Sequence, residues 1–160
     1  MRRTSFETMN CSVAQSLEVV GEWWSMLIVR DAFLGVTRFD DFQERLGISR
    51  NILANRLEHL VGRGVLERRA YQDRPARYDY VLTEKGRGLW HVLTALRQWG
   101  DRWESPQGPP VVVEHRACGN LTTVVPRCEH CGEVLDSGSL ALHAGPGARP
   151  GLAPVPPALR

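Results

Sequence analysis

A chain of 160 residues with 42% apolar and 24% charged residues has the balance of a folded globular protein, and its length suits one domain with a small appendage. The composition excludes a disordered acidic chain. The longest uncharged apolar run, Trp23 to Val29, is far shorter than the roughly 20 residues that a membrane span needs. The N-terminal residues include two arginines but lack the apolar run of a secretory signal. We therefore expect a cytoplasmic protein with no membrane partner.

The net charge of +2 hides an uneven distribution along the chain. Between Arg45 and Arg77 there are eight arginines against Glu58, Glu67 and Asp73, so this stretch carries +5 and the rest is slightly acidic. Cations concentrated on one stretch indicate a polyanionic partner such as double-stranded DNA.

Two helices are expected first. The residues that mark the first helix are apolar and recur at helical spacing: Val13, Leu17, Val20 and Trp24. The following segment, Trp23 to Leu34, is apolar in nine of its twelve residues, which predicts a helix in the centre of the fold. Gly35 is a suitable C-terminal stop for that helix.

A short helix, a turn and a second helix are expected next. Phe39, Phe42 and Leu46 mark the inner face of the short helix, and Gly47-Ile48 form the turn. Ser49 is a good N-cap for a helix over Arg50 to Arg63, with Gly64 as its stop.

The spacing of apolar residues then changes from that of a helix to that of a strand. Val65 to Tyr71 and Tyr78 to Thr83 are predicted strands, and Gln72 to Arg77 is predicted to be a hairpin loop too long for a tight turn. Thr83 is expected to cap one last helix that runs to about Trp103. Its apolar residues follow heptad spacing: Leu89, Val92, Leu96, Trp99 and Trp103. This seam either joins two subunits or packs within one chain.

The order of elements predicts a mainly α fold with a small β-hairpin wing, a winged helix-turn-helix. We expect residues 1–104 to form the DNA-binding and dimerisation domain. Residues 105–110 are predicted to be a linker because proline cannot continue a helix, residues 111–143 a small Cys/His ribbon-like segment, and residues 144–160 a disordered tail.

A helical wheel identifies the DNA-facing side of the helix that Ser49 caps. At 100° per residue, Arg50, Asn51 and Asn55 fall on its outer face, whereas Ile52, Leu53, Arg56, Leu57 and Leu60 fall on the opposite side. Arginine can pair with guanine and asparagine with adenine in the major groove. We therefore expect Ser49, Arg50, Asn51 and Asn55 to contact DNA, and Arg56 to form a buried or half-buried ion pair. Phosphate or minor-groove contacts are expected from Arg38, Arg68, Arg69, Arg74 and Arg77.

The run from Cys11 to Trp103 carries a specific combination of residues: Cys11, Leu17, Gly21-Glu22-Trp23-Trp24, Leu27, Ile28, Arg38, Phe39, Phe42, Leu46-Gly47-Ile48-Ser49, Leu53, Arg56, Leu57, Leu60, Gly64, Val65, Arg68, Pro75, Tyr80, Leu82, Thr83, Gly86 and Trp99. This combination resembles the HxlR-type branch of the MarR-like winged-helix transcription regulators. The resemblance implies a homodimer that binds a palindromic operator and pairs through its N-terminal helix and the helix over 84–103.

The resemblance also draws attention to Cys11. The family often has Cys-Pro where this chain has Cys11-Ser12, and some members sense oxidants or electrophiles with that cysteine. A cysteine at the start of a helix can have its pKa lowered by the helix dipole. Cys11 is therefore either a redox sensor or a buried structural cysteine.

Two Cys/His half-sites lie beyond the linker. His115-x2-Cys118-Gly and Cys128-x2-Cys131-Gly have the spacing of metal-binding knuckles, and three thiolates with one imidazole suit a structural, tetrahedral zinc ion. His130 could replace His115 as the fourth ligand. The alternatives are metal-free reduced cysteines or, less expected in a cytoplasmic protein, a disulfide.

No catalytic constellation is visible. The chain has no Ser/His/Asp arrangement in a convincing context, no Gly-rich phosphate loop and no paired carboxylates placed by a motif, so we expect no enzyme and no catalytic residues. The leading hypothesis is a sequence-specific, dimeric transcription regulator with a small-molecule or oxidant effector. The alternatives are a winged-helix protein-interaction module and a thiol redox protein that uses Cys128 and Cys131.

Overall fold

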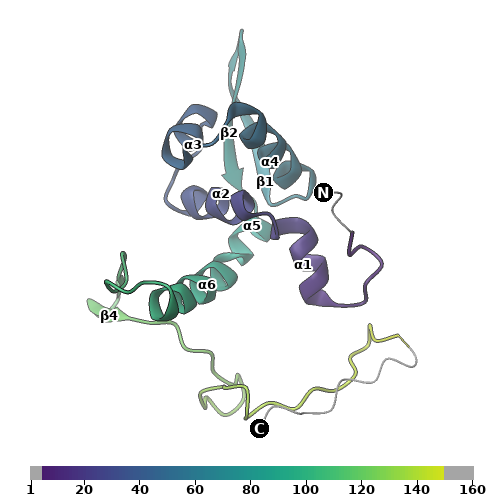
Figure 1. Ribbon diagram of the computed structural model, residues 1–160, viewed down its shortest axis with the longest axis vertical. Coiled ribbons are helices and arrows are strands. Elements are labelled where there is room, and N and C mark those ends of the chain that lie inside the picture. The colour runs from purple at the N-terminus through teal and green to yellow at the C-terminus, as the bar shows by residue number, and fades with distance from the viewer. Residues whose placement is uncertain (1–4, 150–160) are drawn as a thin grey trace. The chain divides into compact units, whose positions relative to one another are not determined.

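The computed structural model describes residues 5–149, which divide along the chain into two compact units with the boundary between Thr94 and Ala95. The elements are α1 (Ser12–Val20), α2 (Trp23–Phe33), α3 (Phe39–Leu46), α4 (Arg50–Gly62), β1 (Leu66–Asp73), β2 (Ala76–Leu82), α5 (Glu84–Gly88), α6 (Trp90–Trp103), β3 (Val113–His115) and β4 (Asn120–Thr122) (Figure 1). This is the mainly α fold with a β-hairpin that the sequence predicted. None of the helices between residues 5 and 149 has the length and apolar character needed to cross a membrane.

The first unit is built around α2. This helix contacts α1, α3, α4 and β2, and its side chains Ile28 and Val29 are fully buried. The apolar sequence of α2 therefore marked the centre of the fold, as predicted, although Trp23 at its start is exposed. The fully buried residues that complete the core come from the neighbouring elements: Phe42, Leu53, Leu57 and Leu60.

The helix-turn-helix is formed by α3 and α4. Gly47 ends α3 with a φ of 64°, a left-handed conformation that glycine adopts without strain. Ser49 then caps α4, because its Oγ accepts a hydrogen bond from the Ile52 N–H at 3.4 Å. The predicted short helix, turn and capped second helix are confirmed.

A buried carboxylate connects α2 to α3. The Asp31 side chain is fully buried, and its two oxygens accept hydrogen bonds from Arg30 Nε at 2.9 Å and Arg45 Nε at 3.3 Å. Burial of a carboxylate is tolerated when it is paired in this way, so Asp31 fixes the position of the helix-turn-helix on the core.

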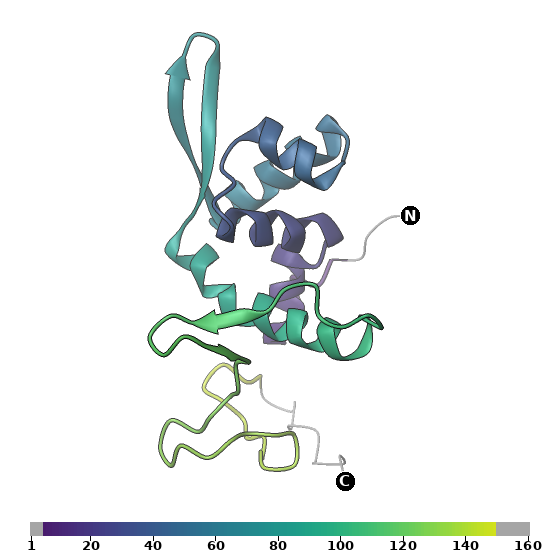
Figure 2. The ribbon, with the colours of Figure 1, turned by 90° about the vertical axis from the view of Figure 1, so that its left-hand side faces the viewer.

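The β1–β2 hairpin is longer than predicted. Its register pairs Leu66 with Leu82 at the base and Asp73 with Ala76 at the tip, so only Arg74 and Pro75, joined by a cis peptide bond, form the turn. The prediction of a long loop over residues 72–77 is wrong. Polar residues there were interpreted as loop, but the outer part of the hairpin projects from the helices and has no buried face that would require apolar residues (Figure 2).

The single helix predicted after Thr83 is instead two. Thr83 caps α5 by accepting a hydrogen bond from the Gly86 N–H at 3.0 Å, and α6 starts after Leu89. Gly86 packs so closely that a Cβ there would lie 2.2 Å from the Val65 carbonyl oxygen. The glycines of α5 are poor helix formers and weaken the continuity that the heptad spacing suggested.

The second unit contains most of α6 and two small β structures. β3 pairs with β4 in antiparallel register, and an isolated bridge joins Arg127 to Val134. No side chain between residues 95 and 149 is buried. The predicted linker at 105–110 contains a turn in which the Gly108 N–H donates to the Ser105 carbonyl. Residues 144–149 are exposed and outside helices and strands, and the rest of the predicted disordered tail lies outside the described residues.

Candidate nucleic-acid interface

The start of α4 presents polar side chains to solvent. Arg50, Asn51 and Asn55 are exposed, whereas Leu53, Leu57 and Leu60 on the other side are fully buried. Ile52 is 41% exposed, so its predicted place on the apolar side is wrong and the buried face of α4 begins at Leu53. The outer face identified from the wheel is available to a ligand.

Arg50 is held against α3 by three contacts that the sequence did not predict. Its Nη1 donates hydrogen bonds of 3.0 Å to Asp40 Oδ1 and Gln43 Oε1, and its guanidinium lies 4.7 Å from the centre of the Phe39 ring. Both partners in the Arg50–Asp40 ion pair are well exposed, so the pair contributes less than about 1 kcal/mol. Arg50 can therefore exchange this carboxylate for a phosphate or a base at small cost.

Further cations lie at the N-cap of α3 and on the hairpin. Arg38 lies 3.9 Å from Asp79 and stacks on Tyr71 at 4.8 Å, while Arg68 stacks on Tyr78 at 5.3 Å. Arg74 lies in the turn at the tip, and Arg77 is exposed next to it. Stacking on tyrosine rings restrains these guanidinium groups without removing them from solvent.

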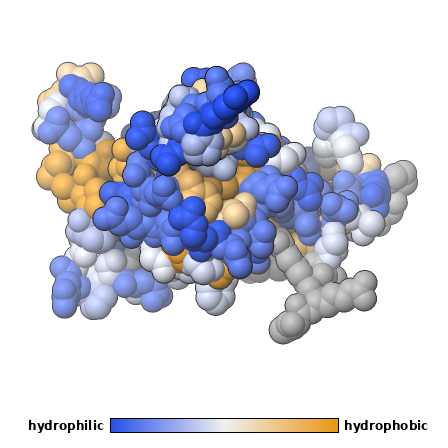
Figure 3. All heavy atoms as spheres, turned by 90° about the horizontal axis from the view of Figure 1, so that it is seen from above, coloured by the Kyte–Doolittle hydropathy of each residue, from blue (hydrophilic) through white to orange (hydrophobic). Residues whose placement is uncertain are grey.

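A hollow of about 380 Å³ lies between α3 and the hairpin. Arg38, Arg50 and Arg77 border it together with Asp40 and Asp41. Tyr80, at its inner side, has its pKa raised by burial. The view onto the hairpin tip shows mostly hydrophilic side chains over this end of the molecule (Figure 3).

Arg56 is directed away from this surface. Its Nη2 lies 3.6 Å from Glu22 Oε1 at the start of α2, and its side chain is 26% exposed. This confirms the half-buried ion pair that the wheel predicted. Arg69, the remaining hairpin arginine, pairs with Glu67 on its own strand.

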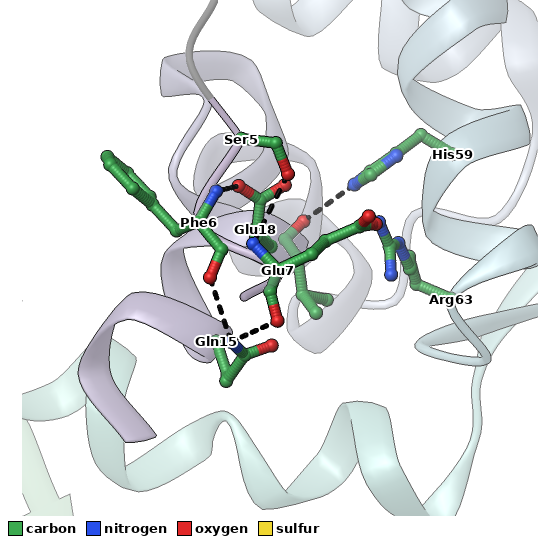
Figure 4. A network of polar contacts seen from close by, with 8 residues as sticks. Ser5, Phe6, Glu7, Gln15, Glu18, His59 and Arg63 are labelled. Carbon is green, nitrogen blue, oxygen red and sulfur yellow. Dashed lines mark hydrogen bonds and ion pairs between the residues drawn. The ribbon is translucent and has the colours of Figure 1, made fainter. Parts of the chain in front are cut away.

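The C-terminal end of α4 is held by the N-terminal segment, residues 5–9, and by α1 (Figure 4). Arg63 Nη2 donates to Glu7 Oε1 at 3.2 Å, and His59 Nε2 lies 3.0 Å from the Val19 carbonyl oxygen. The segment itself is held by α1, because the buried Glu18 carboxylate accepts the Phe6 N–H and Gln15 Nε2 donates to the Phe6, Glu7 and Met9 carbonyls. This network was not predicted from the sequence, in which its only signal is an acidic and an amide side chain on an otherwise apolar helix.

The candidate thiols lie in three places. Cys11 is exposed at the N-cap of α1. His115 and Cys118 flank the turn between β3 and β4, with Nδ1 and Sγ 3.3 Å apart, and a side-chain hydrogen bond from Asn120 lowers the pKa of Cys118. Backbone hydrogen bonds from Cys131 and His130 lower the pKa of Cys128. Among residues 5–149 no three His, Cys, Asp or Glu side chains gather at one point that could hold a metal ion, so the two half-sites lie apart.

The capped helix, the preceding short helix and the flanking hairpin together define the class of winged helix-turn-helix transcription regulators. Within that class the chain belongs to the HxlR-like helix-turn-helix family, whose model matches residues 19–108. The structure and the family match therefore agree with the resemblance found in the sequence.

Three relatives show how far the similarity extends. The HTH-type transcriptional regulator Rv3095 of Mycobacterium tuberculosis is 42% identical over 143 residues, which cover 89% of this chain and 90% of the relative. The crystal structure of PA1607, proposed to be a transcription factor, is 40% identical with a TM-score of 0.77 and covers 89% of this chain and all of that one. The oxidized redox regulator HypR is 30% identical with a TM-score of 0.52, over 56% of this chain and 94% of HypR.

Proposed function

We propose that the protein is a sequence-specific DNA-binding transcription regulator that acts as a homodimer on a palindromic operator. The observation that carries this proposal is the exposed start of α4, where Arg50, Asn51 and Asn55 lie beside a hairpin that bears Arg68, Arg74 and Arg77. The N-terminal residues of a recognition helix are those that reach base edges in the major groove.

The two groups of side chains have different tasks in this proposal. Arg50, Asn51 and Asn55 can form paired hydrogen bonds to guanine or adenine, and so supply discrimination between sequences. Ser49 precedes them at the N-terminus of α4, where backbone N–H groups favour a phosphate. Arg38, Arg68, Arg74 and Arg77 supply affinity for the phosphate backbone that does not depend on sequence and falls with salt.

The proposed homodimer rests on two exposed apolar faces. On α6, Val92, Leu96, Trp99 and Trp103 share one side at spacings of four, three and four residues, and each is more than half exposed. On α1, Val13 and Leu17 are exposed one turn apart. Large apolar side chains grouped in this way mark an interaction surface, and the heptad spacing favours an identical helix as the partner. Two copies of α4 about 34–36 Å apart would enter successive major grooves.

Selection of bound sequences from a random duplex pool tests the proposal. We expect enrichment of a palindrome, and Asn51→Ala should lower the preference for it by about 1–3 kcal/mol while binding to random DNA is retained. Arg74→Ala should weaken binding to both kinds of DNA and reduce the salt slope by about one. Gln107→Ala and Arg149→Ala, at exposed positions outside α4 and the hairpin, serve as matched controls. Absence of any enriched sequence, with weak and salt-insensitive binding, would instead indicate a protein-interaction module.

Sedimentation of two α6 variants tests the dimer. Trp99→Glu places a charge in the centre of the seam and should raise the dimer dissociation constant ~100-fold or more, because a buried aromatic anchor is lost. His91→Glu changes an exposed residue of α6 outside the seam and should leave the constant unchanged. A dimer equally stable in both variants would show that α6 is not the interface.

A thiol effector is the finer part of the proposal. Cys11 is a free, exposed thiol at the start of α1. Gln15 and Glu18 of the same helix hold residues 5–9 against the end of α4. Oxidation there would disturb this support, and the similarity to the redox regulator HypR points the same way. Treatment with an oxidant should change operator affinity in the parent protein but not in Cys11→Ser. An equal response in both would exclude this thiol.

A further inference from the structure

The second unit lacks the packing that normally holds a folded segment together. Between residues 95 and 149 no side chain is buried, and Val113, Val124 and Leu135 are only partly covered. Small segments that cannot bury apolar surface are usually held by disulfides or by a metal ion. The described part of this unit nevertheless contains a β hairpin, a β bridge and three of the four cysteines.

The first Cys/His turn has a well-defined backbone. His115 ends β3, and its carbonyl accepts hydrogen bonds from the Cys118 N–H at 3.1 Å and the Gly119 N–H at 2.8 Å. Gly119 has a φ of 69°, which a larger residue would adopt only under strain. This conformation places His115 Nδ1 3.3 Å from Cys118 Sγ, so both groups already lie on one side of the turn.

The second turn repeats this plan. The Gly132 N–H donates to the Cys128 carbonyl at 2.9 Å, Gly132 has a φ of 76°, and the Cys128 N–H donates to the Glu133 carbonyl at 2.9 Å. The bridge between Arg127 and Val134 closes the base of the turn, as β3 and β4 close the first. Two turns thus share the same spacing of donor side chains, the same hydrogen bond to the first donor residue and the same positive-φ glycine after the second.

The thiols of both turns are accessible to a ligand. Cysteine is among the most frequently buried residue types, yet Cys118 and Cys131 are exposed and Cys128 is only partly covered. Between the turns lie the nine residues 119–127, which when extended can span about 30 Å. The linking segment is therefore long enough for the two pairs of donors to meet.

We infer that His115, Cys118, Cys128 and Cys131 bind one tetrahedral Zn²⁺ ion, which joins the two turns into a zinc ribbon. The two half-sites lie apart in the structure, and each contributes two donors of the four that a closed structural zinc site needs. His115 is preferred to His130 as the imidazole ligand, because His115 Nδ1 lies 3.3 Å from Cys118 Sγ, whereas His130 Nε2 lies 3.6 Å from Glu129 Oε1. With four protein ligands the ion has no open position, so its role is structural and independent of the DNA-binding proposal.

Metal analysis of the full-length protein, purified in a reducing buffer without chelator, tests the inference. We expect about one zinc ion per chain. Cys118→Ser and His115→Asn should lose most of this zinc on dialysis against a competing chelator, whereas Cys11→Ser and His130→Asn should retain it. Replacement of zinc by Co²⁺ should give the intense visible absorption of a tetrahedral thiolate site, and this absorption should be lost in the same two variants.

Protection from trypsin gives a second readout that does not depend on the substitutions. Arg116 and Arg127 lie within the two turns and should be cleaved more slowly in the zinc-loaded protein than after zinc has been removed. Arg77, exposed on the hairpin of the first unit and followed by Tyr78, should be cleaved equally in the two forms and serves as the internal control. Reduced protein that contains no zinc and gives no Co²⁺ absorption would overturn the inference, as would metal retained by both Cys118→Ser and His115→Asn.

Discussion

The two units of the chain are stabilised in different ways. Residues 5–94 surround a core in which Ile28, Phe42, Leu57 and other side chains are completely buried, whereas no side chain from residue 95 to 149 is buried. In the first unit the apolar side chains both drive folding and fix the orientation of α4. In the second, backbone hydrogen bonds and positive-φ glycines define local turns, but no packing connects those turns. The comparison separates local structure, which backbone hydrogen bonds define in both units, from side-chain burial, which the described residues of the first unit alone provide.

The largest expected effect is the loss of a core side chain in the first unit. Leu57→Ala removes a fully buried side chain of α4 and should lower the free energy of unfolding by about 2–5 kcal/mol. Leu121→Ala is the matched change in the second unit. Leu121 is 68% exposed, so the effect should stay within ~0.5 kcal/mol. Urea denaturation followed by far-ultraviolet circular dichroism measures both, and similar losses would mean that β4 is buried in solution.

Substitution of two glycines in α5 tests how closely this helix packs against Val65. Gly86→Ala would bring a Cβ against the Val65 carbonyl and should cost about 1–3 kcal/mol through overpacking. Gly88→Ala meets no atom within 4 Å, and it should stabilise the protein by about 0.5 kcal/mol because alanine is the better helix former. Thermal unfolding of the two variants should therefore shift in opposite directions. A shift in the same direction would contradict the close packing of α5 on Val65.

A smaller effect is expected from the cap of α4. Ser49→Ala removes the acceptor of the Ile52 N–H and should cost about 1 kcal/mol of unfolding free energy. Ser16→Ala is the control: it lies within α1, where its Oγ donates to the Ser12 carbonyl, and alanine is favoured there by helix propensity. If Ser16→Ala were as destabilising as Ser49→Ala, the cap would have no special role.

The smallest effect is expected on the stability of the first unit when the proposed zinc ion is removed. A ligand stabilises only the part of the protein that binds it, so chelation should leave the unfolding midpoint of the first unit unchanged. Hydrogen exchange of the α2 and α4 amides, compared with and without chelator, checks this, and amides of β3 and β4 provide the contrast. Faster exchange in α2 would show that the two units are coupled.

Local sequence signals predicted much of the first unit. The apolar spacing around Phe42, the turn glycine Gly47 and the capping Ser49 identified the helix-turn-helix, because each of these residues acts over a few positions. The tip of the hairpin was wrongly predicted to be a loop, because an exposed strand has no apolar face by which the sequence could identify it. The break at Leu89 was missed because the close approach of Gly86 to Val65 is a contact between distant parts of the chain.

The candidate site was predictable to a similar degree. A helical wheel found the exposed face with Asn51 and Asn55 and the half-buried ion pair of Arg56, since these follow from periodicity alone. It could not show that Arg50 contacts Asp40, or that Arg63 contacts Glu7 from 56 residues away. Pairs of this kind depend on how helices are oriented in three dimensions, which the spacing of apolar residues does not specify.

The anchoring of Ser5 to Met9 against α1 and α4 has a practical consequence for handling the protein. An affinity tag or fusion partner attached in front of this segment would be only a few residues from Glu7 and its contact with Arg63. Such an addition would weaken the support of α4 before any nucleic acid is present. A label for affinity measurements is better attached at the other terminus.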